Sequence, residues 1–164
     1  MIKRFSKIVW EAVLLIAAVI VIGIVFSYAS SGSNNQFKAT EIFSSQIKSE
    51  ETKVVYIWAI WCTVCKANES VIQTNRDIAF KYFKVPFYSI EEGDDPEGLK
   101  KYIHEKKLEG KILLADTPFM KINKVASYPT LMFINSKNEI VFRDTGIVSP
   151  IGFFLRLSLL KLLQ

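Results

Sequence analysis

The sequence predicts an α/β fold in which helices cover both faces of a central mixed β-sheet, preceded by one N-terminal transmembrane helix. Three observations predict this arrangement. One apolar run is long enough to span a bilayer, and strand and helix patterns alternate through the rest of the chain. Near the C-terminus, two strand patterns are separated by a short polar turn, which adds an antiparallel pair to the sheet.

The N-terminal run, residues 8–29, holds 19 apolar residues among 22, and no other segment of the 164-residue chain has this character. Three basic residues precede the run, and after it no charged residue occurs before Lys38. The basic residues are Lys3, Arg4 and Lys7. The positive-inside rule therefore predicts a cytoplasmic N-terminus, with the rest of the chain on the other side of the membrane.

This interpretation divides the chain into a cytoplasmic basic tail (1–7), a transmembrane signal anchor (8–29), a polar linker (30–36) and an extracytoplasmic domain (37–164). The alternative is a cleaved signal peptide, because Ser27-Tyr28-Ala29 fits a small-x-small cleavage site. The run is longer than the usual signal-peptide core, which favours the anchor. The expected location is a single-pass protein of the plasma (inner) membrane with a periplasmic domain.

The net charge of +5 carries little information about partners. Residues 1–29 contribute +2, and the remaining +3 is spread through the domain among 18 basic and 15 acidic residues. This mixed pattern does not predict a phosphate-binding face, so no nucleic-acid partner is expected.

The first half of the domain alternates between extended and helical patterns. Residues 37–49 form a lead-in that is a short helix or irregular, and residues 53–60 are β-branched, aromatic and apolar, which predicts a strand buried on both faces. Residues 65–83 have helical spacing, residues 85–90 form a second strand, and a turn at 91–96 precedes a polar helix at 97–107.

The second half continues with a short strand at 111–115 and a short helix that Pro118 opens at its first position. Residues 130–134 and 139–143 form two strands joined by a hairpin turn at 135–138. Ser149-Pro150 starts a final helix that ends at about residue 163. The apolar residues of this helix lie mainly on one face: Ile151, Phe154, Leu155, Leu159 and Leu162.

The two cysteines form one motif, Trp61-Cys62-Thr63-Val64-Cys65-Lys66, between a buried strand and a helix. Cys62 then lies at the helix N-terminus, where free N–H groups favour a thiolate, and Cys65 lies one turn later within disulfide reach. We expect an exposed Cys62 to attack a partner disulfide and a more buried Cys65 to resolve the mixed disulfide. Lys66 is a nearby positive charge with a minor effect.

Other uses of the two cysteines remain open. A structural disulfide across so short a loop would restrict the unfolded chain little. A zinc site needs about four ligands, and the only histidine, His104, lies in a charged helix as an expected surface residue. A soft ion such as Cu(I) on two thiolates stays as an alternative. We therefore expect no resident metal and no cofactor.

The segments VVYIWAIWCTVCK and YPTLMFIN resemble the thioredoxin fold, and the anchored, exported layout resembles its TlpA/ResA-like branch, including the ScsD-type copper-tolerance and thiol:disulfide interchange proteins. The resemblance covers residues 40–163. It implies a thioredoxin-like fold with a helix–strand insertion at 97–115. It also implies a cis Tyr128–Pro129 bond facing the disulfide, with Tyr128 contacting the substrate backbone. Trp61 is expected to flank the disulfide and cover one side of it.

Two departures from the family pattern affect the chemistry. Tyr56 stands where cytoplasmic thioredoxin has a buried acid, and a phenol with an ordinary pKa of ~10 cannot accept a proton at neutral pH. Water or a nearby glutamate is expected to move the proton of the resolving cysteine. Thr63-Val64 between the cysteines supplies no histidine donor, which favours the reducing side of the redox range.

The sequence therefore predicts a membrane-tethered thiol–disulfide oxidoreductase that reduces disulfides of exported proteins through Cys62 and Cys65. The expected partners are exported protein thiols and disulfides, a transmembrane electron donor, and membrane lipid around residues 8–29. The resemblance implies a role in cell redox homeostasis, for example in cytochrome c maturation or copper tolerance. The alternatives are a Cu(I)-binding thiolate module and a non-catalytic thioredoxin-like scaffold.

Overall fold

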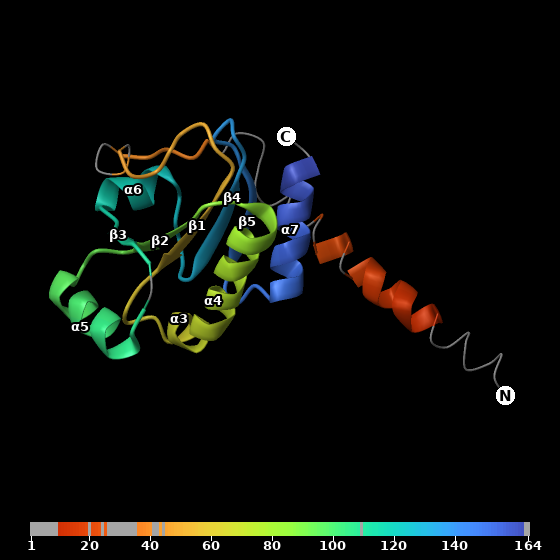
Figure 1. The fold of residues 1–164 in the computed structure, drawn as a ribbon, viewed down its shortest axis with the longest axis horizontal. Coiled ribbons are helices and arrows are strands. Elements are labelled where there is room, and N and C mark those ends of the chain that lie inside the picture. Colours follow the sequence, from red (N-terminus) through yellow and green to blue (C-terminus); the bar gives the residue numbers. More distant parts are fainter. Residues whose placement is uncertain are drawn as a thin grey trace.

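The computed structural model describes residues 10–19, 21–23, 25, 36–40, 43, 45–108 and 110–162. Residues 10–19 form a helix that extends away from the sheet (Figure 1). Among the described residues, no helix combines the length and apolar character needed to cross a membrane. The predicted basic tail, residues 1–7, and residues 30–35 of the predicted linker lie outside the described residues.

Five strands form the predicted mixed sheet, in the order β3-β2-β1-β4-β5 (Figure 1). The strands are β1 (Lys53–Trp58), β2 (Phe87–Glu91), β3 (Ile112–Leu114), β4 (Thr130–Ile134) and β5 (Ile140–Thr145). β2 pairs in parallel with β1 and β3, whereas β4 pairs antiparallel with β1 and β5. β1 is buried at every position, as its continuous apolar character predicts for a central strand.

The helices of the domain lie on both faces of the sheet, as predicted. They are α3 (Thr63–Ala67), α4 (Glu69–Ile78), the π-helical turn η1 (Ala79–Phe83), α5 (Pro96–Lys106), α6 (Thr117–Ile122) and α7 (Pro150–Leu162). The segment expected as a helix–strand insertion, 97–115, contains β3 and all of α5 except its first residue, Pro96. β3 forms one edge of the sheet.

Alternate residues of β1 contribute to two cores, one on each face of the sheet. Tyr56 and Trp58 belong to the core that includes Phe153 and Leu157 of α7. Val55 and Ile57 belong to the other core, together with Phe119 of α6 and with Phe37, Phe43 and Ile47 of the lead-in. This two-sided burial follows from the pleat of a strand, whose successive side chains point to opposite faces.

The helix predicted over residues 65–83 is divided in the structure. Asn68 separates α3 from α4, and its backbone N–H donates to the carbonyl oxygens of Val64 and Cys65 at 3.0 and 3.1 Å. After this break, α4 continues directly into η1. The helical segment ends at Lys84, whose φ of 54° is left-handed. The division leaves the second cysteine in a separate helix of one and a half turns at the end of β1.

The apolar face that the sequence predicts for α7 coincides only in part with the face that the helix buries. Of its five residues, Ile151, Phe154 and Leu162 are 70%, 42% and 79% exposed. Leu155 and Leu159 are half-buried, and Leu159 packs against the core. The fully buried residues are Phe153, Leu157 and Leu160. Apolar residues occupy both faces of this helix, so their spacing alone cannot identify the face that meets the sheet.

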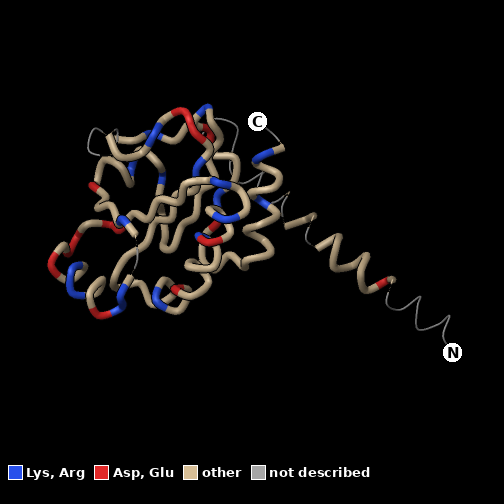
Figure 2. The backbone as a smooth tube through the Cα atoms, viewed as in Figure 1, with Lys and Arg blue, Asp and Glu red and all other residues tan. Residues whose placement is uncertain are grey.

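The shorter connections agree with the prediction except in one position. The hairpin turn at 135–138 is present, with the N–H of Asn138 donating to the carbonyl of Asn135 at 3.0 Å. α6 begins at Thr117, so Pro118 is its second residue and not its first. The side chain of Asp116 caps this helix by accepting the N–H of Phe119 at 2.8 Å. Figure 2 shows basic and acidic residues interspersed along the domain, as the sequence predicts.

Candidate active site

The two cysteines lie where the chain leaves the carboxyl end of β1 and enters α3. Cys62 is the N-cap of α3, with an extended backbone (φ −73°, ψ 109°), and Cys65 lies inside the helix. The two residues form a disulfide, with their Cα atoms 5.2 Å apart. The predicted sequence of strand, motif and helix N-terminus is therefore confirmed.

Backbone hydrogen bonds hold the motif and point a donor at sulfur. The N–H of Cys65 donates to Sγ of Cys62 at 3.1 Å. The N–H of Cys62 donates to the carbonyl of Ala59 at 3.1 Å, and the N–H of Lys66 donates to the carbonyl of Cys62 at 3.1 Å. An N–H directed at sulfur stabilises negative charge there, so the Cys62 thiolate formed on reduction has a donor in place.

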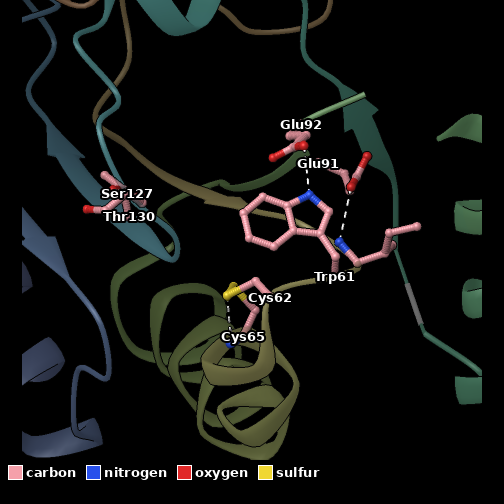
Figure 3. Close-up of a disulfide and its surroundings, with 8 residues drawn as sticks. Trp61, Cys62, Cys65, Glu91, Glu92, Ser127 and Thr130 are labelled. Carbon is pink, nitrogen blue, oxygen red and sulfur yellow. Dashed lines mark hydrogen bonds between the residues drawn. A yellow bond between two sulfur atoms is a disulfide. The ribbon is translucent and has the colours of Figure 1, made fainter. Parts of the chain in front are cut away.

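Both cysteines are buried, which corrects the expectation that Cys62 is exposed. The exposed fractions are 6% for Cys62 and 3% for Cys65, so Cys62 is slightly the more exposed residue of the two. Other residues of the motif are exposed to solvent: Trp61 is 61% exposed and Val64 is 44% exposed. Figure 3 shows the Trp61 side chain above the disulfide, in the flanking position predicted for it.

Trp61 joins the motif to two other segments of the chain. Its indole N–H donates to Oε1 of Glu92 at 2.8 Å, and its ring packs edge-on against Tyr128 with centroids 5.6 Å apart. Burial raises the pKa of the Tyr128 phenol, and the neighbouring Glu92 carboxylate raises it further. Tyr128 is therefore a neutral hydrogen-bonding group at neutral pH. The structure thus brings Trp61 and Tyr128 into contact, a pairing that the sequence did not predict.

The segment before β4 completes this side of the site. The Tyr128–Pro129 peptide bond is cis, as the resemblance implied. Pro129 is buried, and its carbonyl accepts the N–H of Gly146 at 2.9 Å. The Thr130 hydroxyl donates to the carbonyl of Ser127 at 2.7 Å, and Figure 3 shows both residues across from Trp61. These contacts hold the turn that carries Tyr128 and Pro129.

Glu91 is a supporting residue that the sequence interpretation assigned to a turn. It is the last residue of β2, 1% exposed, and its carboxylate accepts the N–H groups of Ile60 and Gly93 at 3.2 and 2.8 Å. Burial raises its pKa, and the two N–H donors oppose that rise. Its bond to Ile60 holds the loop two residues before Cys62 (Figure 3). One sequence signal could have indicated this role: the acidic pair Glu91-Glu92 at the carboxyl end of an apolar strand. In a parallel pair of strands this end lies beside the end of β1 that leads into the cysteines.

Lys66 and His104 play smaller parts. Nζ of Lys66 lies over the ring of Tyr102, 5.9 Å from its centroid, so this side chain contributes to the contact between α3 and α5. His104 is exposed on α5, as predicted. In the part of the chain that the structure describes, no group of three or more His, Cys, Asp or Glu side chains is arranged to hold a metal ion.

Tyr56 lies in the core of the sheet face that also contains both cysteines. Burial raises the pKa of its phenol above the ordinary value, and the nearby Tyr102 and Glu69 raise it further. The structure thus agrees with the expectation that this residue accepts no proton at neutral pH, which leaves the proton of the resolving cysteine to another group.

Comparison with known proteins identifies the family. Residues 40–158 match the profile of a thioredoxin-like domain, and no curated protein matches the chain. Similar solved structures include StoA from Bacillus subtilis, with 20% identity over 71% of this chain and 85% of that one and a TM-score of 0.57. A thioredoxin family thiol:disulfide interchange protein from Chlorobium tepidum has 15% identity over 68% and 80%, with a TM-score of 0.55. The exposed lipoprotein thioredoxin from Streptococcus pneumoniae has 19% identity over 67% and 85%, with a TM-score of 0.54.

These structural similarities support the fold, and the family match covers most of the domain that contains the disulfide. The chain therefore belongs to the thioredoxin-like domain family, and Cys62 and Cys65 form a disulfide within the matched residues.

Proposed function

We propose that this protein is a membrane-tethered oxidoreductase that reduces disulfides of exported proteins. The observation that carries the proposal is the hydrogen bond from the Cys65 N–H to Sγ of Cys62 at the N-cap of α3, because it prepares Cys62 as the attacking thiolate. The more buried Cys65 is then in place to resolve the mixed disulfide.

The reducing direction is supported by the surroundings of Cys62. Threonine and valine separate the two cysteines, so the motif offers no histidine to stabilise a thiolate further. Two carboxylates, Glu91 and Glu92, contact the residues directly before Cys62, and negative charge there disfavours a thiolate. Since a less stabilised thiolate makes a dithiol a stronger reductant, both features favour transfer of electrons to the substrate.

The reaction proceeds in two exchanges. The Cys62 thiolate attacks one sulfur of a substrate disulfide, which forms a mixed disulfide and releases the other substrate sulfur as a thiolate. The Cys65 thiolate then attacks Sγ of Cys62, which closes the Cys62–Cys65 disulfide and releases the second substrate sulfur. Two electrons pass from the protein dithiol to the substrate, and a dithiol electron donor that spans the membrane regenerates the reduced pair.

The proposal includes the membrane tether and the branch. The apolar run at 8–29 and the basic residues before it support a cytoplasmic tail and a periplasmic domain, in a protein of the TlpA/ResA-like branch. A tether raises the concentration of the domain near membrane partners without any new contact. The proposal includes a role in copper tolerance, in which the protein reduces exported thiols that copper has oxidised to disulfides.

Reduction of insulin disulfides by the full chain in detergent, with dithiothreitol as electron source, tests the activity. We expect turnover in the wild type, none in Cys62→Ser, and a trapped mixed disulfide in Cys65→Ser. A wild type without exchange activity, or full activity in Cys62→Ser, contradicts the proposal. Thiol trapping in cells tests the direction: a mostly reduced pair supports a reductase, and a mostly oxidised pair contradicts it.

A further inference from the structure

A cavity of about 230 Å³ adjoins Cys65, between the sheet and helices α4 and α5. Residues that line it include Tyr56, Trp58, Cys65, Glu69, Tyr102 and Ile112. Its volume is several times the roughly 30 Å³ that a water molecule occupies in the liquid, and its wall offers carboxylate and hydroxyl groups as partners. The cavity therefore has room for water between Cys65 and the polar groups of the wall.

Glu69 is the one carboxylate among the described residues that line the cavity. It begins α4 directly after Asn68, four residues after Cys65 in the sequence. Its Oε1 accepts the hydroxyl of Tyr102 at 3.0 Å, and its Oε2 lies 3.9 Å from Nζ of Lys106. The ring of Tyr102 packs on Trp58, with centroids 5.9 Å apart. α5 therefore holds the Glu69 carboxylate at a wall that it shares with Cys65.

The other titratable groups around Glu69 are phenols and cations. They are Tyr56 of β1, Arg76 of α4, Tyr88 of β2, Tyr102 and Lys106 of α5, Lys111 before β3, and Lys66 of α3, which lies over the Tyr102 ring. Burial raises the pKa of Tyr88 and of Tyr102 to about 12, and it raises the pKa of Tyr56 as well. At neutral pH these phenols hold their protons, so the carboxylate is the proton acceptor that this cavity offers.

Cys65 needs such an acceptor. Its side chain is 3% exposed, and burial in apolar surroundings disfavours a thiolate. The resolving step requires the thiolate, because a neutral thiol is a poor nucleophile. The second exchange therefore requires that Cys65 lose its proton.

We propose that Glu69 accepts the proton of the Cys65 thiol through cavity water during the resolving step. The inference rests on the proposed function, because it concerns the second of the two exchanges. The S–H proton of Cys65 passes through water to the carboxylate, and the resulting thiolate forms a bond to Sγ of Cys62. The bond between Cys62 and the substrate sulfur breaks, and its electron pair leaves with the substrate. Glu69 afterwards returns the proton to solvent.

The test compares the resolving rate of the full chain in detergent, by rapid mixing of the reduced protein with a disulfide peptide. Glu69→Gln keeps an oxygen that can accept from Tyr102 but cannot take a proton. We expect this variant to resolve the mixed disulfide at least about tenfold more slowly at neutral pH. The deficit should shrink as the pH rises, because hydroxide then removes the proton of Cys65 without help from a carboxylate.

Two control variants separate proton transfer from folding. Glu105→Gln makes the same change on the exposed side of α5, where Glu105 lies 3.8 Å from Lys101, and should leave the profile unchanged. Glu69→Asp retains a carboxylate at the cavity and should retain the neutral-pH rate within a few fold. A Glu69→Gln profile that coincides with the wild type, or is lowered equally at every pH, overturns this inference and leaves the proposed function standing. A wild type without exchange activity overturns the proposed function itself.

Discussion

The indole N–H of Trp61 donates to Glu92 at 2.8 Å, which ties the residue before the attacking cysteine to the connection after β2. The same indole ring meets Tyr128, the residue before the cis proline. Three segments that are far apart in the sequence therefore converge beside Cys62. A substrate that reaches this sulfur meets a rim of one tryptophan, one neutral tyrosine and one carboxylate.

Trp61→Phe tests the hydrogen bond in this rim. The variant keeps an aromatic ring against Tyr128 but removes the N–H donor to Glu92. Because Trp61 is largely exposed, we expect the free energy of unfolding to fall by no more than about 1 kcal/mol. Exchange with a disulfide peptide should slow by up to about fivefold, chiefly through a higher KM. Unfolding by denaturant and steady-state kinetics measure the two effects, and an unchanged KM with a large loss of stability would contradict this role.

Glu91→Gln tests the buried carboxylate that holds the loop before Cys62. The amide can accept only on its oxygen, so one of the N–H groups of Ile60 and Gly93 loses its acceptor. We expect the free energy of unfolding near pH 4 to fall by about 1–3 kcal/mol. Denaturant titration measures this loss. A substitution without effect would show that these two hydrogen bonds contribute nothing to the fold.

The pH dependence of stability gives a second prediction for Glu91. Burial raises its pKa in the folded protein, so the folded state holds the proton to higher pH than the unfolded state does. The stabilisation of the folded state by protonated Glu91 is therefore fully present below the ordinary pKa of 4.5 and is lost as the pH rises through the raised pKa. Glu91→Gln removes this titration, so its unfolding free energy should fall less steeply with pH just above 4.5. If the unfolding free energy of the wild type and of Glu91→Gln fell equally steeply with pH, Glu91 would not have a raised pKa in the folded protein.

Reduction of the Cys62–Cys65 disulfide should change the stability only slightly. The loop that it closes has a sequence separation of 3, so the bond restricts the unfolded chain by about 2 kcal/mol at most. The N–H of Cys65 also stabilises the reduced sulfur, which offsets part of this loss. Denaturant unfolding of the oxidised and reduced full chain measures the difference. A loss well above this value would favour a structural disulfide in a non-catalytic scaffold over a redox-active one.

The parts of the fold that the sequence predicted well are those with strong local signals. β1 is continuous in apolar and β-branched residues, the cysteine motif follows it at once, and Asn138 closes a hairpin turn. Each of these patterns depends on neighbours within a few residues. They are sufficient to place Cys62 at a helix N-terminus and Cys65 within the helix that follows.

The supporting residues depend on contacts between distant segments, which the spacing of residues does not record. Glu91 binds the N–H of Ile60, 31 positions earlier, and Glu69 meets Tyr102, 33 positions later. The burial of Cys62 also results from tertiary packing, because its own motif contains exposed neighbours. The division of the helix at Asn68 follows from hydrogen bonds of one residue and leaves the apolar spacing on either side intact.

Two adjacent phenylalanines of α7 test which face of this helix is buried. Phe153 is fully buried among the sheet residues, and its ring lies 5.3 Å from that of Phe133, whereas the outward Phe154 is 42% exposed. We expect Phe153→Ala to lower the free energy of unfolding by about 3–5 kcal/mol, because it leaves a cavity in the core. Phe154→Ala should cost about 1 kcal/mol, since it removes only a partly buried ring that packs on Phe83 at 5.0 Å. Denaturant unfolding of both variants decides the orientation. A larger loss in Phe154→Ala than in Phe153→Ala would mean that α7 is rotated, with the face that the apolar spacing favoured turned toward the sheet.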